Sequence, residues 1–350
     1  MGIRLKNRRN FVRAILILVI MIFIGVKGIQ FLNNSASKGK DDSKTANNST
    51  EQEILKGKIL EVKENGDISL DESKYFIRYS IAVPEGKDYE GFQQDKEYIF
   101  LNMKNYSKVS LNTKSFKETS KDIILADING KPTLAIKKTY TDNNFVFFDE
   151  VISSVVILIS KEVQPFKHSV VLDPGHGGVD PGAPAYDNSF EEKDITLKIQ
   201  LDLRQELIFK GCKVGMSREE DKTIRVEDVV AFAEKQKPDV FASVHINSYE
   251  KSKAYNGIET YYSKENIKLA ESKKLAEKIQ ANAVKSDGWK DRGVVSANFF
   301  VIKHTTMPAV LIECGFASNP EDVARLKDNN CLRNLSKNIS QGILQYLDAQ

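Results

Sequence analysis

The chain is poor in the residue types that hold structural metal sites. Of its 350 residues only three are cysteines, Cys212, Cys314 and Cys331, and no two of them form a CxxC pair. A cysteine zinc knuckle is therefore excluded, and at most one intrachain disulfide can form. Histidine is scarce as well, with four residues in the chain. Any imidazole site in this protein therefore depends on a few specifically placed side chains.

An excess of charge of one sign is also missing. The 51 Lys and Arg residues nearly balance the 48 Asp and Glu residues, which leaves a formal net charge of +3. Strong nucleic-acid binding is therefore not indicated, and no basic patch interleaved with aromatic residues argues otherwise. We expect no nucleic-acid partner.

Long apolar runs are limited to one, at residues 14–26, after a basic start at residues 1–10. This run is too short for a bilayer core of about 30 Å, but residues 11–32 reach that length. We therefore expect an N-terminal membrane anchor over residues 1–32. A cleaved signal peptide is the alternative, although Lys27 interrupts the approach to the small-residue site Ser35-Ala36-Ser37. In the anchored form, the positive-inside rule places the rest of the chain outside the cytoplasm.

Composition divides the remainder of the chain. Residues 33–52 are rich in Ser, Asn, Lys and Asp and predict a polar linker. Residues 53–161 contain short β-like segments at 59–62, 98–101 and 155–159, with turn signals at Asn65-Gly66 and Asn129-Gly130. This pattern predicts a small β-rich domain, which acts either as a spacer or as a binding module. Residues 165–350 then form a second domain.

The second domain opens with a chemically informative turn. The apolar run Val170-Val171-Leu172 is followed by Asp173-Pro174-Gly175-His176-Gly177-Gly178. A short apolar run stopped by Pro and Gly predicts a buried strand that breaks into a tight turn. The glycines let a substrate or an ion approach the backbone closely. A histidine presented this way is a metal ligand or a base, unless the turn is merely glycine-rich and contains a histidine by chance.

Two further polar side chains follow apolar strands. His245 comes directly after residues 240–244, and Glu313 comes directly after residues 309–312. Strands separated by helical stretches predict an α/β fold with a largely parallel twisted sheet flanked by helices. The carboxyl ends of parallel strands share one edge of the sheet, so His176, His245 and Glu313 are expected to converge there. Glu192 lies just ahead of a predicted helix whose apolar face ends before Gly211, and that face consists of Ile195, Ile199, Leu203 and Leu207.

Two imidazoles and a carboxylate with an open fourth position are the ligand set of a catalytic zinc site. A further glutamate fits a general base or acid for the metal-activated water. Each residue also has a structural interpretation, because buried histidines are usually satisfied by hydrogen bonds and Glu192 can complement the dipole of its helix. His168 and His304 lack a strand-end position and are not expected in the site.

Several ordered motifs carry a resemblance to a known family. The segment from Leu172 to Gly178, with Asp180-Pro181-Gly182-Ala183 after it, resembles the opening motif of the zinc-dependent N-acetylmuramoyl-L-alanine amidases of the Amidase_3 family. The later blocks of that family are similar, in order, to Glu192-Lys193-Asp194, Ser243-Val244-His245-Ile246-Asn247, Gly257-Ile258-Glu259-Thr260-Tyr261-Tyr262, Asp291-Arg292-Gly293 and the stretch from Leu311 to Asn319. The resemblance covers roughly residues 168–348.

The resemblance implies that His176, Glu192 and His245 bind one Zn²⁺ and that Glu313 is the catalytic glutamate. The implied reaction is hydrolysis, in peptidoglycan, of the amide between N-acetylmuramic acid and the L-alanine of the stem peptide. Two alternatives remain open: a zinc peptidase that cuts within the stem peptide, and a catalytically inactive wall-binding or assembly protein. Together with the N-terminal segment, the resemblance predicts a single-pass protein of the cell membrane with its catalytic domain outside the cytoplasm, or a protein secreted to the cell wall.

Two departures from the family pattern are visible. On the helix expected between Arg225 and Lys235, Asp228 and Glu234 stand where many relatives carry an Arg and an Asn, which changes local salt bridging. The stretch from Asn247 to Gly257 is short and has no room for the autoinhibitory helix that some relatives insert there.

Overall fold

The computed structural model describes residues 58–59, 68–83, 89–103, 123–128, 131–149, 153–249 and 251–350. All of them belong to one compact unit, Gly57–Gln350. The membrane anchor predicted over residues 1–32 and the linker predicted over 33–52 lie outside the described residues and stay predictions. Among the residues that the structure describes, no helix is long and apolar enough to cross a membrane.

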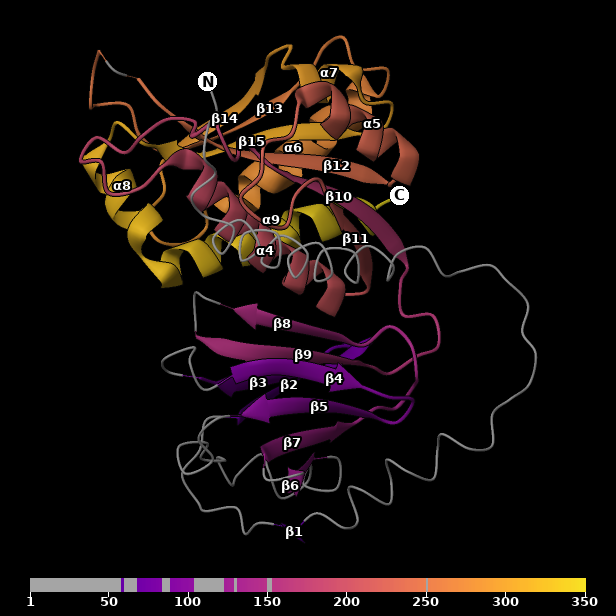
Figure 1. The fold of residues 1–350 in the computed structure, drawn as a ribbon. Coiled ribbons are helices and arrows are strands. Elements are labelled where there is room, and N and C mark those ends of the chain that lie inside the picture. Colours follow the sequence, from indigo (N-terminus) through magenta and orange to yellow (C-terminus); the bar gives the residue numbers. More distant parts are fainter. Residues whose placement is uncertain are drawn as a thin grey trace, which may run out of the picture. The chain divides into compact units, whose positions relative to one another are not determined.

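The N-terminal part of this unit consists of two antiparallel sheets (Figure 1). The five-stranded sheet has the order β1 (Lys58–Ile59), β6 (Ile123–Ile128), β7 (Lys131–Lys137), β5 (Tyr98–Met103) and β4 (Tyr89–Gln94). The four-stranded sheet has the order β2 (Ile68–Glu72), β3 (Phe76–Ala82), β9 (Ser154–Ser160) and β8 (Phe145–Asp149). Apolar side chains from both sheets, such as Ile81, Leu101 and Ile157, form one buried core.

Several strands predicted from the sequence occur in these sheets. The segments 98–101 and 155–159 lie in β5 and β9. Of the segment predicted at 59–62, only Ile59 lies in a described strand, β1. β6 and β7 pair in antiparallel fashion on either side of Asn129-Gly130, as expected for a hairpin. The two turn signals themselves, Asn65-Gly66 and Asn129-Gly130, lie outside the described residues.

The C-terminal part contains a six-stranded sheet whose order is β11, β10, β12, β15, β13, β14. The bounds of these strands are Cys212–Met216, His168–Pro174, Val240–Asn247, Ala309–Phe316, Ile258–Tyr262 and Asp291–Ser296, respectively. The first four strands are mutually parallel, which confirms the predicted, largely parallel α/β sheet. β13, however, runs antiparallel to β15. The reason is the short connection between β12 and β13. A strand parallel to β12 would have to start at the edge of the sheet where β12 starts, and reaching that edge needs a crossover of a dozen or more residues.

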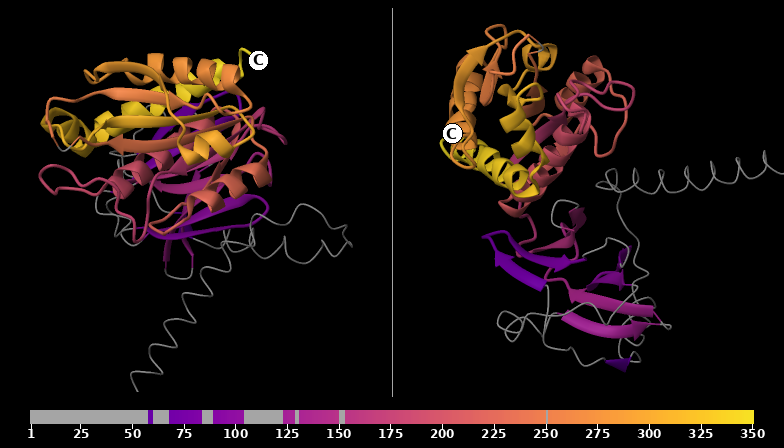
Figure 2. Two further views of the ribbon diagram at one scale, coloured as in Figure 1. Left: turned by 90° about the horizontal axis from the view of Figure 1, so that it is seen from above. Right: turned by 90° about the vertical axis from the view of Figure 1, so that its left-hand side faces the viewer.

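Helices cover both faces of this sheet (Figures 1 and 2). On one face, apolar strand side chains such as Val170 and Leu172 pack with residues from α4 (Glu192–Phe209), α6 (Leu269–Ala283) and α9 (Asn329–Leu347). The alternate side chains, such as Val171, pack with residues from α5 (Val226–Gln236) and α7 (Phe300–His304) on the other face. A further helix, α8 (Pro320–Lys327), follows β15. The alternation follows from the two-residue period of a strand.

The elements that carry the predicted site residues are close to expectation. α4 buries Ile195, Ile199, Leu203 and Leu207 as predicted and ends before Gly211, but Glu192 is its first residue rather than lying ahead of it. His245 and Glu313 do not follow their strands, as the sequence predicted, but lie inside β12 and β15. The pairing of β12 with β15 extends to these residues, and His245 and Glu313 are direct partners in the parallel ladder.

Side chains of α4 also contact the four-stranded sheet. Phe209 packs in a buried cluster with Phe76 and Leu158. The guanidinium of Arg78 lies 2.5 Å from the carboxylate of Glu206 and over the ring of Phe209. The β-rich part is therefore joined to the α/β part by buried apolar and ionic contacts.

Candidate active site

His176 is presented by the turn that follows β10. Its backbone adopts φ of +62°, and its Nδ1 atom lies 2.8 Å from Oδ2 of Asp180. Gly175 precedes it, and a Cβ atom at that position would lie 2.3 Å from the ring of His245. A side chain at residue 175 would therefore displace the imidazole of His245. The glycine is required because the turn passes directly against His245.

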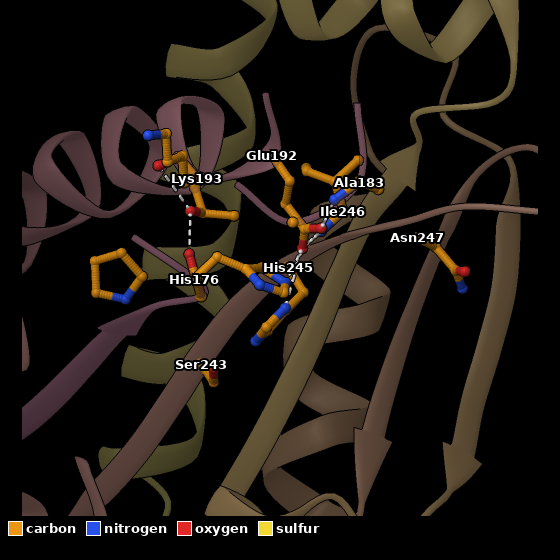
Figure 3. Close-up of polar contacts among 12 residues, drawn as sticks. His176, Ala183, Glu192, Lys193, Ser243, His245, Ile246 and Asn247 are labelled. Atoms are coloured by element: carbon orange, nitrogen blue, oxygen red, sulfur yellow. Dashed lines mark hydrogen bonds and ion pairs between the residues drawn. The ribbon is translucent and has the colours of Figure 1, made fainter. Parts of the chain in front are cut away.

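Glu192 lies between the two histidines at the start of α4 (Figure 3). Its Oε1 atom is 3.2 Å from Nε2 of His176 and 3.0 Å from Nδ1 of His245. Backbone N–H groups hold the carboxylate in place: Ile246 donates to Oε1 at 2.9 Å and Ala183 donates to Oε2 at 2.8 Å. One potential ligand atom from each of the three residues lies within 4.8 Å of the others. The structure therefore brings together the three residues predicted as metal ligands.

The electrostatics of the three residues are strongly coupled. Burial alone would raise the pKa of Glu192, but hydrogen bonds with His176 and His245 outweigh it and lower that pKa to about 2. The hydrogen bond with Glu192 raises the pKa of His176 to about 9. Glu192 is thus a permanently ionised carboxylate at a position where it is only 3% exposed. A buried anion shared by two imidazoles is an environment that favours a cation.

The donor set fits zinc. One carboxylate and two imidazole nitrogens converge from three different segments of the chain. Hard oxygen-only sites suit Ca²⁺ or Mg²⁺, whereas this mixture of nitrogen and oxygen ligands suits Zn²⁺. Both imidazoles also line a cavity, so a fourth position has access to a ligand.

Glu313 lies beside this cluster on β15. It is 9% exposed, and its Oε2 atom is buried without a hydrogen-bond partner among the described residues. Burial raises its pKa to about 7; His245 opposes this shift, whereas the carboxylates of Glu192 and Glu259 reinforce it. A carboxyl group with a pKa near neutrality can both accept and release a proton, which is the property of a general acid or base.

A cavity of about 360 Å³ opens next to Glu313. Its polar lining includes His176, His245 and Glu313, together with Asp173, Asp180, Ser217 and Arg218. The other walls come mainly from α5, α7 and the residues before them, namely Ile224, Val226, Val229, Phe299, Phe300 and Val301. The cavity therefore gives a substrate access to both predicted histidine ligands and to the predicted catalytic carboxyl at the same time.

Sequence reasoning did not assign a role to Arg218, which contacts the backbone of the turn that carries His176. This side chain is 1% exposed and donates to the backbone carbonyls of Pro174, Gly175 and Lys193, at 3.1, 2.9 and 2.9 Å. It thereby ties the turn after β10 to the first turn of α4. Ser217-Arg218 directly follows β11. This position after a parallel strand is a sequence signal that Arg218 lies at the same edge of the sheet as the site.

The remaining two histidines lie away from the cluster, as expected. His168 is at the opposite end of β10 from His176, with Nε2 3.6 Å from Oδ1 of Asp348. His304 is the last residue of α7 and packs against Phe300, with ring centroids 4.3 Å apart.

Comparison with known proteins agrees with this geometry. A family model described as Amidase_3, N-acetylmuramoyl-L-alanine amidase, matches residues 170–345. The amidase LytC of Bacillus subtilis is 35% identical over 178 residues, which cover 51% of this chain and 35% of LytC. The probable cell wall amidase LytH of Staphylococcus aureus is 34% identical over 192 residues, which cover 54% of this chain and 62% of LytH. The chain thus spans less than two thirds of either protein.

Two solved structures are similar to the C-terminal part. An N-acetylmuramoyl-L-alanine amidase from Clostridium difficile 630 is 35% identical with a TM-score of 0.51, and the match covers 52% of this chain and 98% of that one. The CwlD amidase from Clostridioides difficile, solved in complex with the GerS lipoprotein, is 30% identical with a TM-score of 0.50, and the match covers 53% of this chain and 100% of that one. With a family match over half of its length and the His–Glu–His cluster in place, the chain belongs to the Amidase_3 family of N-acetylmuramoyl-L-alanine amidases, in which zinc is a general feature.

Proposed function

We propose that this protein hydrolyses the amide between N-acetylmuramic acid and the L-alanine of the stem peptide in peptidoglycan. The observation that carries the proposal is Glu313, a buried carboxyl without a hydrogen-bond partner on one oxygen, which faces the same cavity as His176 and His245. A structural glutamate would have both oxygens satisfied, because unpaired buried polar groups are costly. Amide hydrolysis needs a proton acceptor at this place.

In this proposal His176, Glu192 and His245 hold one zinc ion. When bound, Zn²⁺ supplies Lewis acidity, which polarises the amide carbonyl and lowers the pKa of water. Asp180 accepts the hydrogen bond of His176 Nδ1, so Nε2 of that ring is the nitrogen that would bind the metal. Partners of this kind orient a ligating histidine and raise its basicity.

Glu313 carries the proton in the proposed reaction. It accepts a proton from the attacking water and delivers it to the nitrogen of the departing L-alanine. Its raised pKa suits both steps, since general catalysis is most effective when the pKa of the group lies near the working pH. Proton transfer by a positioned side chain contributes about 10²- to 10⁴-fold to the rate.

The test is mass spectrometry of purified wall fragments digested with the full-length protein. Free stem peptides that begin with L-alanine are the expected products, and they vanish after treatment with a chelator and return when Zn²⁺ is added. New amino termini further along the stem would instead identify a zinc peptidase. Sedimentation with the wall without any released peptide would identify an inactive wall-binding protein. A variant His245→Ala that keeps full zinc and full activity would refute the ligand assignment.

We further propose that residues 1–32 anchor the protein in the cell membrane, with the catalytic part outside the cytoplasm. The basic start and the apolar run support this proposal. The expected result is a full-length chain in the membrane fraction that detergent releases. A soluble extracellular form whose N-terminal sequence starts near Lys38 would show that the segment is a cleaved signal.

A further inference from the structure

Arg292, at the start of β14, is held by a buried carboxylate next to the site. Its Nε atom donates to Oε1 of Glu259 on the neighbouring strand β13. The other oxygen of Glu259 accepts from the hydroxyl of Tyr261 at 2.6 Å. Glu259 is only 6% exposed, so this carboxylate serves as a fixed anchor for one side of the guanidinium.

Two aromatic rings flank the same guanidinium. Its Cζ atom lies 5.4 Å from the ring centroid of Tyr255 and 5.1 Å from that of Phe316. These contacts and the bond to Glu259 restrict the rotamers of a side chain that is otherwise flexible. Among the described residues, neither terminal nitrogen of Arg292 has a hydrogen-bond partner. The side chain, 24% exposed, therefore presents the Nη1–Nη2 edge of a preoriented guanidinium.

This edge lies close to the proposed reaction centre. Glu259 is directly opposite Glu313 in the antiparallel pairing of β13 with β15. β14 is the next strand beyond β13. Two strand spacings amount to about 10 Å, a span that about three residues of an extended peptide cover. Arg292 therefore lies within reach of the residues that follow a scissile bond held at Glu313.

We propose that Arg292 binds a carboxylate of the stem peptide, on the amine side of the cleaved bond, and makes the enzyme select acidic stem peptides. The inference rests on the proposed amidase function and adds a specificity-determining residue to it. The chemistry is the end-on, bidentate pairing of a guanidinium with a carboxylate, which is stronger than a neutral hydrogen bond and demands a planar partner. In this proposal Glu259 does not contact the substrate; it holds Arg292 in place.

The experiment compares two synthetic substrates on the full-length zinc-loaded protein. One is N-acetylmuramoyl-L-alanyl-D-glutamate, and the other is the same compound with both glutamate carboxyls converted to carboxamides. We expect wild-type protein to cleave the acidic substrate with a kcat/KM about 10- to 100-fold higher, since hydrogen bonds to charged groups have that effect. Arg292→Met should abolish this preference, mainly through KM for the acidic substrate.

Arg292→Lys separates recognition from structure, because lysine retains a cation for Glu259 but lacks the planar edge. It should keep thermal stability and turnover of the amidated substrate near wild-type values while losing most of the preference. The control is Lys273→Met, which removes one positive charge from an exposed side chain on α6 and should keep the preference in full.

Two results would overturn the assignment of Arg292. Equal turnover of both substrates by wild-type protein would do so, and so would an equal loss on both substrates in the Arg292 variants. Wild-type protein that releases no L-alanyl amine from either substrate contradicts the amidase function itself, and the assignment of Arg292 falls with it.

Discussion

At the scale of single residues, the site depends on side chains that orient the predicted ligands. Asp180→Asn replaces the carboxylate that accepts from His176 Nδ1 with a weaker, neutral acceptor. We expect zinc affinity to fall about 10- to 100-fold, as is typical when the partner of a ligating histidine is lost. Competition with a chromogenic chelator measures this affinity. Asp187→Asn, on an exposed loop without contact to the imidazoles, is the matched control. Unchanged zinc affinity in Asp180→Asn would show that Asp180 does not orient the ring.

The sequence was sufficient to predict that His176, Glu192, His245 and Glu313 lie close together, because each occurs at or next to the end of an apolar strand or the start of a helix. It was not sufficient to find the partner of His176 or the anchor of Arg292. Both depend on side-chain directions across a turn and between adjacent strands, and chain periodicity does not encode those directions.

At the scale of secondary-structure elements, Arg218 connects the turn after β10 with α4. Arg218→Met would leave the buried carbonyl of Pro174 without its side-chain donor and would remove one donor each from the carbonyls of Gly175 and Lys193, which the hydroxyl of Thr196 also contacts. An unsatisfied buried group costs about 1–3 kcal/mol, so we expect the free energy of unfolding to fall by that amount. Urea denaturation measures the change.

The control for this element is Arg225→Met, because Arg225, the N-cap residue of α5, is exposed and pairs with Asp228 of that helix. An exposed pair of this kind contributes about 0.2–1 kcal/mol. If the two variants lose the same small amount of stability, the turn does not depend on Arg218.

The element pattern was predictable as far as local periodicity reaches. Clear apolar patterns mark α4, β10, β12 and β15. The parallel arrangement of the three strands follows from the helices between them. The reversed direction of β13 is not part of the sequence prediction, because strand patterns alone do not give the direction of a strand. The missing helical crossover before it was the signal that its strand starts at the edge where β12 ends.

At the scale of the whole molecule, Asp202 on α4 links stability to pH. Burial, together with the nearby Asp149 of β8, raises its pKa from 3.8 to about 8. The folded state therefore holds a proton that the unfolded chain releases near pH 3.8, so folding takes up a proton between about pH 4 and 8. The free energy of unfolding should fall as pH rises across this window.

Asp202→Asn removes the titrating group and should flatten this dependence, giving a protein more stable than wild type at pH 8–9 but similar to it near pH 4. Chemical denaturation at several pH values measures both. Asp228→Asn, at an exposed position, should keep the wild-type slope. A wild-type stability that rises from pH 5 to 8 in parallel with that of Asp202→Asn would contradict the role of Asp202.

The most direct measurement of the central claim compares zinc content and wall digestion in Glu313→Gln and Glu192→Gln. Glutamine preserves volume but accepts no proton, so Glu313→Gln should retain near-stoichiometric zinc and lose at least about 10²-fold in the release of stem peptides. Glu192→Gln should lose zinc, because a neutral amide is a poorer ligand than a carboxylate. If Glu313→Gln instead loses its zinc and recovers activity when metal is resupplied, Glu313 is a ligand, and another residue carries the proton.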